Sequence, residues 1–495
     1  MMGYQPPPQS SLFYSRFNLE ERIRSGHPLR GVDAVLDLDF VYSEVADSYG
    51  YNGKVSIPPP VIVKLMLLLV FYNVRSEREL MASLPERLDW LWFLGLDLDS
   101  EIPHHSVLSK ARKRWGADVF RLLFERVVWQ CVEVGLVDGE KLFCDSSLVD
   151  ADASCNSVVK RMDGKRLRLA YSELEERLED VEEADGDSDD SDGDGQRHNV
   201  VNRQYGSTTD PDASVVRKGV GKARPRYQTH RAIDGACGVI TATVIGPGDE
   251  NEAHRLGELI DQSHANTGKS SSTVVADSKY GTTDNLLDCH RRGIKAHMPV
   301  LKEKQKDSGR RKGIFTGEAF VYRPERDVYI CPAGEELPRR KHRARRRALE
   351  YAAPRQTCGS CHLRDQCTRS KTGGRTIKRH EQQGILDQMR EQACSNAAKR
   401  NIRIRQHFME GSFAGSTRFG YKRARWRGLW RVQIQDHLIA TVQNIGLLTK
   451  FGNPRPRMAQ AMSIPERIRQ GVTWQLLAFF SCIRLRKTLP VHAIR

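Results

Sequence analysis

Between residues 12 and 137, the apolar runs and the polar residues between them predict a series of helices. The longest apolar run, residues 61–72, is interrupted by Lys64 and preceded by three prolines, which suit a first helical turn. Its 12 residues are fewer than the roughly 20 that cross a bilayer, so we expect a buried helix. A basic helix is expected to end before Gly116. These patterns predict a helical N-terminal domain over residues 1–137.

After Gly139 the pattern changes to short apolar runs that are rich in β-branched residues. A strand that carries Asp145 comes first. Residues 226–281 then show the order strand, strand, helix, strand, which is typical of an α/β domain with a mixed sheet. We expect an amphipathic helix over residues 432–448 to cover that sheet.

The formal charge of +16 favours a polyanionic partner, although basic proteins also bind ribosomes or membrane surfaces. Residues 171–195 hold 13 acidic residues and one arginine, which leaves +28 on the rest of the chain. Within that stretch, residues 184–200 are too acidic and too poor in apolar residues to pack, so they predict a disordered acidic loop.

The N-terminus and the cysteines indicate the cellular compartment of the protein. The first residues are polar and rich in proline, without the apolar segment of a signal peptide. Eleven cysteines are an odd number in a long chain, which favours a reducing compartment over a disulfide framework. We expect a bacterial cytoplasmic protein associated with the nucleoid and not with a membrane.

Three acidic residues are candidates for a metal centre. Asp145 ends one predicted strand, Asp277 ends another, and Glu410 lies in a predicted helix. Cleaving and joining phosphodiesters needs two divalent cations, and Mg²⁺ prefers carboxylate oxygens. Carboxylates at neighbouring strand ends and on a covering helix can meet at one point. Taken singly, each acid is equally well explained as a cap, a turn residue or a solvated side chain.

The sequence around these acids resembles a known family. The segments are DSSLVDADAS (145–154), TDPDA (209–213), YQTHRAIDGACGVITA (227–242), VADSKYG (275–281) and MEGSFAGSTRFGYKRARWRGL (409–429). In this combination and order they resemble the DDE transposases of bacterial insertion sequences. The resemblance implies a helical N-terminal domain, a ribonuclease H-like core and an insertion before the last catalytic helix.

Carried over by motif, the resemblance makes Asp145 the first catalytic acid, Asp277 the second and Glu410 the third, with two Mg²⁺ or Mn²⁺ ions as cofactors. Asp150 and Asp152 are rivals of Asp145, but they fall where the family places a turn.

A related pattern in the family has arginine four residues before the glutamate and lysine seven residues after it. Gln406 and Thr417 stand at those places, with Arg405 and Arg418 one residue away. A shift of one residue turns a helical side chain by about 100°, which puts phosphate contacts by these arginines in doubt.

Four cysteines suggest a second metal site. Cys331 is followed by Cys358, Cys361 and Cys367, and the C-x2-C spacing of the middle pair suits a structural Zn²⁺ that staples a loop-rich insertion. Ordinary free thiols are the alternative, and His362 is a possible substitute ligand. Four thiolates would leave no open position for catalysis.

Basic residues in three segments are candidates for binding the DNA backbone, with solvated or disordered charge as the alternative for each. The arginines of the third segment alternate with Trp426 and Trp430, which either stack on a base or belong to the core. The candidates are Lys110, Arg112 and Arg114 in the first segment, Arg343, Arg345 and Arg346 in the second, and Arg418, Arg425 and Arg427 in the third.

Together these features predict an α/β protein: a ribonuclease H-like mixed sheet, a helical N-terminal domain and a basic, cysteine-containing insertion. The expected function is a DNA transposase that acts on terminal inverted repeats and target DNA, as a homodimer in the synaptic complex. A structure-selective nuclease with the same acids and an inactive, transposase-derived DNA-binding protein are the alternatives. The predicted boundaries are 1–137 (helical), 138–300 (first part of the core), 301–395 (insertion), 396–450 (last part of the core) and 451–495 (tail).

Overall fold

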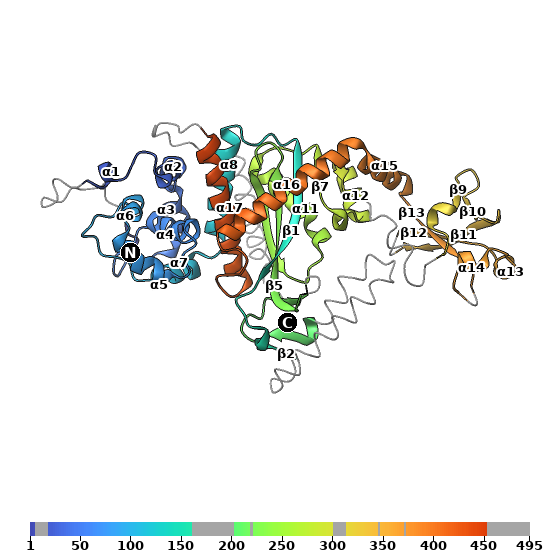
Figure 1. Cartoon of the computed structure of the whole chain (residues 1–495), viewed down its shortest axis with the longest axis horizontal. Coiled ribbons are helices and arrows are strands. Elements are labelled where there is room, and N and C mark those ends of the chain that lie inside the picture. The colour runs from blue at the N-terminus through green and yellow to red at the C-terminus, as the bar shows by residue number, and fades with distance from the viewer. Residues whose placement is uncertain are drawn as a thin grey trace, which may run out of the picture. The chain divides into compact units, whose positions relative to one another are not determined.

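The computed structural model describes residues 1–4, 18–160, 202–217, 221–299, 313–344, 347–370 and 373–452 (Figure 1). The predicted acidic loop at 184–200 lies outside the described residues. Arg345, Arg346 and nearly all of the predicted tail lie outside them as well.

The N-terminal region is helical, as predicted. Local capping explains several helix ends: the Ser76 hydroxyl accepts the Glu79 N–H at 3.1 Å, and Gly116, with φ of +70°, ends the predicted basic helix. Short 3₁₀ turns follow two of the helices. The helices are α1 (Leu19–Arg22), α2 (Pro28–Val35), α3 (Phe40–Val45), α4 (Pro59–Phe71), α5 (Glu77–Ser83), α6 (Leu88–Leu94), α7 (Ser106–Trp115) and α8 (Asp118–Glu133).

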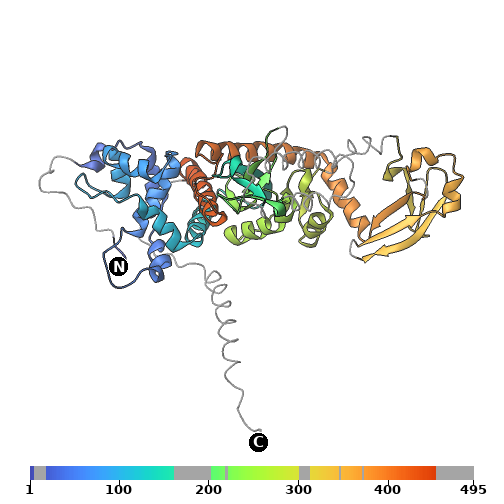
Figure 2. The ribbon, with the colours of Figure 1, turned by 90° about the horizontal axis from the view of Figure 1, so that it is seen from below.

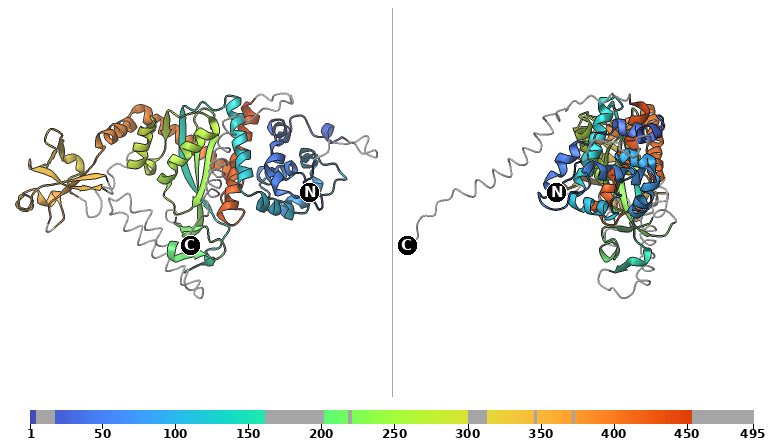
Figure 3. Two further views of the ribbon diagram at one scale, coloured as in Figure 1. Left: turned by 180° about the vertical axis from the view of Figure 1, so that it is seen from behind. Right: turned by 90° about the vertical axis from the view of Figure 1, so that its left-hand side faces the viewer.

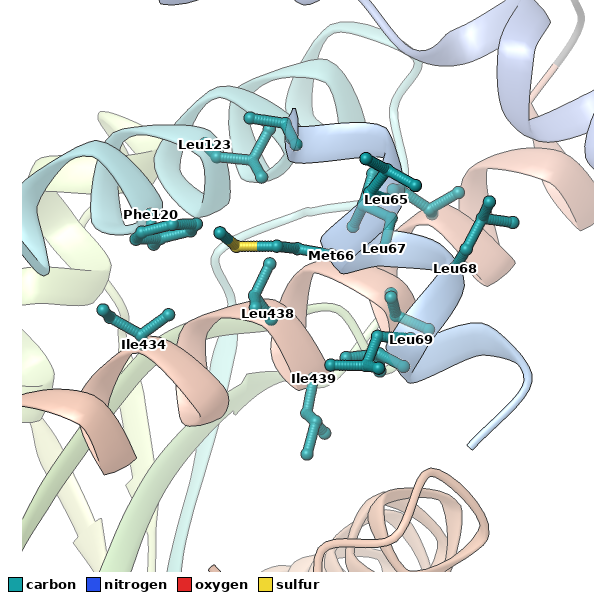
Figure 4. Packing of buried hydrophobic residues seen from close by; sticks show 14 of the residues in the cluster. Leu65, Met66, Leu67, Leu68, Leu69, Phe120, Leu123, Ile434, Leu438 and Ile439 are labelled. Atoms are coloured by element: carbon teal, nitrogen blue, oxygen red, sulfur yellow. The ribbon is translucent and has the colours of Figure 1, made fainter. Parts of the chain in front are cut away.

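Helix α4 is the predicted buried helix, and it is apolar on every side because other helices surround it. Figure 4 shows Leu65 to Leu69 of α4 beside side chains of α8, such as Phe120, and of the last helix, α17 (Leu429–Phe451), such as Leu438. The N-terminal helices therefore share one hydrophobic core with the end of the described chain. No helix in the described part is both long and apolar enough to cross a membrane.

The main sheet is mixed, and its strand order is β4-β5-β1-β7-β8, with β6 paired to β5. β1 runs antiparallel to β5 and parallel to β7. The predicted order of two strands, a helix and a strand is confirmed by β5, β6, α11 (Leu256–Thr267) and β7. The strands are β1 (Lys141–Asp150), β4 (Ser214–Val216), β5 (Arg224–Asp234), β6 (Ile240–Pro247), β7 (Thr273–Val275) and β8 (Lys295–His297).

One detail of the strand prediction is wrong. Asp145 does not end β1, because the strand continues for five residues to Asp150. The reason is its neighbour: β5 is long enough to pair with β1 all the way to Arg226, which lies opposite Asp150.

Alternate residues of β1 face two helical layers, because successive strand side chains point to opposite faces. Leu142 and Cys144 pack in a core with α11, α12 (Thr283–Arg291) and α15 (Gln383–Cys394). Phe143 packs on the other face with α8, α16 (Asn396–Arg418) and α17. Figure 3 shows α11 and α12 in front of the sheet in its left-hand view, and Figure 1 shows α16 running across the opposite face.

A buried charged network fastens α16 and α17 to the sheet. The fully buried Arg231 of β5 donates to Ser416 Oγ at 2.6 Å on α16 and to Gln443 Oε1 at 2.9 Å on α17. It also lies 3.6 Å from the carboxylate of Asp436, which accepts a hydrogen bond from Thr229. Buried charges are stable only when they are paired in this way. The helix that carries Glu410 is thus held against β5.

Between α12 and α15 the chain forms a second, antiparallel sheet of five strands (Figure 2). Phe320, Tyr329, Leu337 and Tyr351 form its small core. The predicted loop-rich insertion therefore has a sheet of its own. Its elements are β9 (Val321–Arg323), β10 (Val328–Ile330), β11 (Glu336–Arg343), β12 (Ala348–Ala352), β13 (Thr376–His380), α13 (Arg355–Gly359) and α14 (Arg364–Cys367).

Candidate metal centre and nucleic-acid interface

The register of the sheet brings Asp145 and Asp277 together. Phe143 of β1 pairs with Val275 of β7, and this pairing is the last of the parallel ladder. Each aspartate stands two residues beyond that last pair, so both follow the same edge of the β1–β7 pairing. The sequence prediction for these two acids agrees with this placement.

A third acid in the cluster, Glu252, was not predicted. One ligand oxygen from each of Asp145, Glu252 and Asp277 lies within 4.8 Å of the other two. Glu252 begins a 3₁₀ turn, Glu252–Arg255, that follows β6 and is capped by the Asn251 side chain. The available signal was an acidic turn after a predicted strand. Because the segment between β6 and this turn also holds Asp249 and Glu250, the sequence alone could not select Glu252.

Two cations and two backbone amides stabilise the cluster. Arg405 of α16 donates from Nη1 to Asp145 Oδ2 at 2.7 Å, and Lys279 Nζ lies 2.9 Å from Glu252 Oε1. The N–H of Ser146 donates to Asp145, and the N–H of Lys279 donates to Asp277. These donors offset part of the mutual repulsion of the three carboxylates.

Burial acts against ionisation at the two aspartates. It raises the pKa of the Asp145 carboxyl above its ordinary value, even though Arg405 opposes the shift. The pKa of Asp277 is raised by burial first and by the charge of Glu252 second. A bound divalent cation would favour the ionised form of every one of these acids. The donor set, which consists of carboxylate oxygens, is the one that Mg²⁺ or Mn²⁺ prefers.

Glu410 lies in α16, as predicted, but it does not belong to the group of acids within 4.8 Å. Its side chain is exposed and accepts a hydrogen bond from Gln406 Nε2 at 3.1 Å. The residues of α16 that face the sheet include Arg405 and Met409, and Glu410 is turned by about 100° from Met409. Its catalytic role stays a prediction.

The two rival aspartates have other partners. Asp150 pairs with Arg226 at 2.7 Å, and Asp152 pairs with Arg423 and Arg427 at 3.0 Å each. Both lie beyond Asp145 toward the far end of β1, where these ion pairs hold neighbouring segments together.

The four cysteines of the small sheet meet around one cavity of about 30 Å³. Phe320 and Leu337 complete its wall, and every cysteine in the described part of the chain is free. Burial, and then the other three thiols, raise the pKa of Cys367, while Arg375 opposes them. Among the described residues, no three of these sulfurs come within 4.8 Å of one another. The cavity is lined by Cys331, Cys358, Cys361 and Cys367.

The predicted basic helix divides into two kinds of residue. Lys110 and Arg114 are exposed, and the Arg114 guanidinium lies over the ring of Tyr49. Arg112 is only 4% exposed and forms an ion pair with Glu77. The charge of Arg112 is thus already paired inside the domain, and its binding to DNA stays a prediction.

The arginines near the start of α17 differ in the same way. Arg425 donates to the backbone carbonyl of Val74, so it ties the segment before α17 to the N-terminal helices, and its DNA contact stays a prediction. Arg427 is exposed and pairs with Asp152, and Arg418 is exposed on α16.

Trp426 and Trp430 pack against the main core, which favours the core alternative for both rings. Arg343 lies on β11, where positions 338–343 are all exposed, and it pairs with Glu350 of β12 at 2.8 Å.

Comparison with known families supports the resemblance. The model described as "Transposase domain (DUF772)" matches residues 17–114, and the model described as "Transposase DDE domain" matches residues 330–449. No curated protein gave a significant match. The two matches confirm the predicted resemblance to DDE transposases. Together with the mixed sheet between helical layers, they confirm the α/β, ribonuclease H-like fold class.

Proposed function

We propose that this chain is a DNA transposase that cuts the ends of its element and joins them to target DNA with the acids of the sheet edge. The observation that carries the proposal is the cluster that contains Asp145 and Asp277, in a chain whose two matched regions are both transposase domains. Three oxygen ligands from separate elements within 4.8 Å are suited to a divalent cation.

The reaction consists of two in-line displacements. In the first, a water oxygen attacks the phosphorus at the element end and the bond to the 3′ oxygen breaks, which leaves a 3′ hydroxyl. In the second, that hydroxyl attacks a phosphorus of the target strand and displaces the target's 3′ oxygen. Two bound Mg²⁺ or Mn²⁺ ions would activate the attacking oxygen and stabilise the leaving oxygen.

Asp145, Asp277 and Glu410 are the proposed catalytic acids. The sheet fixes the first two, since they follow the last backbone pair between β1 and β7. Glu410 is on the helix that is already bonded to Asp145 through Arg405. Five residues separate Arg405 and Glu410, which is about 7.5 Å along a helix axis. Arg405 positions Asp145 and restrains α16, the helix that carries Glu410.

The exposed cations are the proposed contacts to the DNA backbone. Lys110, Arg114, Arg343 and Arg418 all have exposed side chains. Phosphate contacts of this kind position DNA without reading its sequence. The proposed partners are the terminal inverted repeats and the target DNA, bound by a homodimer.

The four cysteines are proposed to hold a structural Zn²⁺. Their convergence on one cavity supports this, since they come from separate loops and helices of the small sheet. Thiolates are the ligands of closed, structural zinc sites, and a reducing cytoplasm would keep these thiols free for the metal.

The test is a reaction of the purified full chain with DNA that ends in the element's inverted repeats, with Mg²⁺ or Mn²⁺ present or removed. We expect metal-dependent 3′ nicking at the repeat end, followed by joined products. Glu410→Gln should abolish both steps, and Glu391→Gln, an exposed glutamate of α15, should abolish neither. Cutting without joining would favour the nuclease alternative, and specific binding without cutting would favour the inactive DNA-binding protein.

A further inference from the structure

We propose that Glu252 supplies a further carboxylate to the metal centre, beside Asp145 and Asp277. This inference rests on the proposed function and adds a ligand that the DDE pattern of two aspartates and a helical glutamate does not contain. Glu252 comes from the turn after β6, an element that supplies none of those three acids.

Glu252 meets the same distance limit in the cluster as the two aspartates. Its ligand oxygen lies within 4.8 Å of those of both Asp145 and Asp277. Its side chain is 16% exposed, and the cation that it meets, Lys279, is 65% exposed. Lys279 follows Asp277 by two residues, so its flexible side chain neutralises Glu252 from the solvent side. An ion pair whose cation is this exposed is weak enough for a divalent cation to replace it.

Two buried polar side chains beside the cluster lack a hydrogen-bond partner in the described structure. The hydroxyl of Tyr280 is fully buried and unpaired, and both ring nitrogens of the fully buried His230 are unpaired as well. Buried polar atoms without a protein partner mark places where ordered water or an ion completes the bonding.

Both side chains are close enough to Glu252 to feel its charge. Burial raises the pKa of Tyr280, and so do the charges of Glu252, Asp145 and Asp277. Burial lowers the pKa of His230 to about 4, and Glu252 opposes that shift. His230 lies opposite Ser146 of β1, and Ser146 directly follows Asp145 in the sequence. A hydrated cation held by the three acids would give these groups the polar surroundings that the protein alone does not supply.

The experiment measures Mn²⁺ binding to the full chain by titration calorimetry, without DNA, so the readout does not depend on activity. Glu252→Gln keeps the shape of the side chain, and we expect it to raise the Kd by about 10-fold or more. Glu250→Gln is the matched control, because Glu250 is also a partly exposed glutamate that pairs with an arginine, Arg255. It should stay within about 2-fold of wild type. Equal melting temperatures of the metal-free proteins would establish that the variants fold.

A second variant separates ligation from the loss of an ion pair. In Glu252→Gln, Lys279 loses its bond to Glu252, and its positive charge near the site would by itself repel a cation. If that repulsion were the whole effect, Glu252→Gln would no longer weaken Mn²⁺ binding in a Lys279→Met background, and the proposal would be overturned. We expect the loss to persist there.

The outcomes also distinguish this inference from the proposed function. If Asp145→Asn weakens Mn²⁺ binding and Glu252→Gln does not, the inference is wrong and the proposed function stands. If neither change weakens binding, the acidic edge is no metal site and both are wrong.

Discussion

The two candidate metal sites of this chain are built in opposite ways. The acid cluster collects residues 145, 252 and 277, which are far apart in sequence. Sheet register brings Asp145 and Asp277 together, and the turn after β6 adds Glu252. The cysteine site uses residues 331–367, within one small sheet. Two of the acids, Asp145 and Glu252, are ion-paired to Arg405 and Lys279, whereas the thiols line an apolar cavity. The difference is what chemistry requires: a catalytic site must stay open to its substrate, and a structural one must be closed.

The largest expected effect is loss of cleavage at the acid cluster. Asp145→Asn and Asp277→Asn should each lower the rate of 3′ nicking at least about 1000-fold, because each removes a charged metal ligand and leaves the shape unchanged. Asp150→Asn is the control on the same strand, since Asp150 pairs with Arg226 and lies outside the cluster. Nicking rates are measured on labelled repeat ends.

If Asp150→Asn lowered the nicking rate as much as Asp145→Asn, the acid cluster would not be the site of cleavage. The same conclusion would follow if both cluster variants stayed active. Bound zinc should be unchanged in all three variants, since the cysteines lie in another sheet.

The next largest effect is expected at the cysteine site of the small sheet. Cys361→Ser should release the bound zinc and unfold the small sheet, because metal binding in small zinc domains supplies about 10 kcal/mol of folding free energy. Zinc content is measured by atomic emission, and unfolding by protease cleavage within residues 313–380. Cys394→Ser is the control, since Cys394 is exposed and does not line the cavity. A chain purified without zinc, with the small sheet still protected, would contradict a structural zinc.

A smaller effect is expected at the buried network of Arg231, which holds α16 and α17 against the main sheet. Arg231→Met should destabilise the main core by about 3–5 kcal/mol, because it leaves the buried Asp436 without its cation. Arg121→Met removes a half-exposed pair with Glu125 and should cost at most about 1 kcal/mol. Urea unfolding followed by tryptophan fluorescence reports this region, since residues 301–395 contain no tryptophan. If both variants lost the same free energy of unfolding, the buried network would contribute no more to stability than the half-exposed pair.

The sequence predicted the parts of the fold that depend on local pattern. The helical N-terminal region, the buried helix at residues 61–72 and the order of β5, β6, α11 and β7 follow from apolar periodicity and caps, which neighbouring residues determine. The closeness of Asp145 and Asp277 could also be predicted, because both follow apolar strand segments and a known motif surrounds each.

What failed depends on distant partners. Asp145 was placed at a strand end because nothing nearby shows that β5 extends the pairing to Asp150. The ion pair of Arg112 was not foreseen, because its partner Glu77 lies 35 residues earlier in the sequence, on another helix. Glu252 was missed because only the three-dimensional path of the chain after β6 distinguishes it from Glu250. A site assembled by sheet register therefore needs the structure, whereas one assembled within a short segment, such as the cysteines, is visible as a spacing.

The smallest expected effect is on folding stability at acid pH, and it separates the main core from the small sheet. Burial lowers the pKa of His230 and of His437 to about 4, whereas a histidine in the unfolded chain titrates near 6.5. As the pH falls below about 6.5, the unfolded chain takes up protons first, so the stability present above that pH is lost toward pH 4. At pH 5 the loss should be about 2 kcal/mol for each histidine.

Urea unfolding at pH 7.5 and pH 5, read by tryptophan fluorescence, measures this loss in the main core. His437→Leu should remove the share of this one histidine, about 2 kcal/mol at pH 5, because Leu cannot be protonated and the site, beside Phe124, is apolar on one side. His362→Leu, at an exposed position by the cysteines, should leave it unchanged. The described part of the small sheet has no buried histidine, so protection from protease at residues 313–380 should not follow the same titration when zinc is saturating. A pH dependence that survives His437→Leu in full would mean that this histidine is protonated within the folded core.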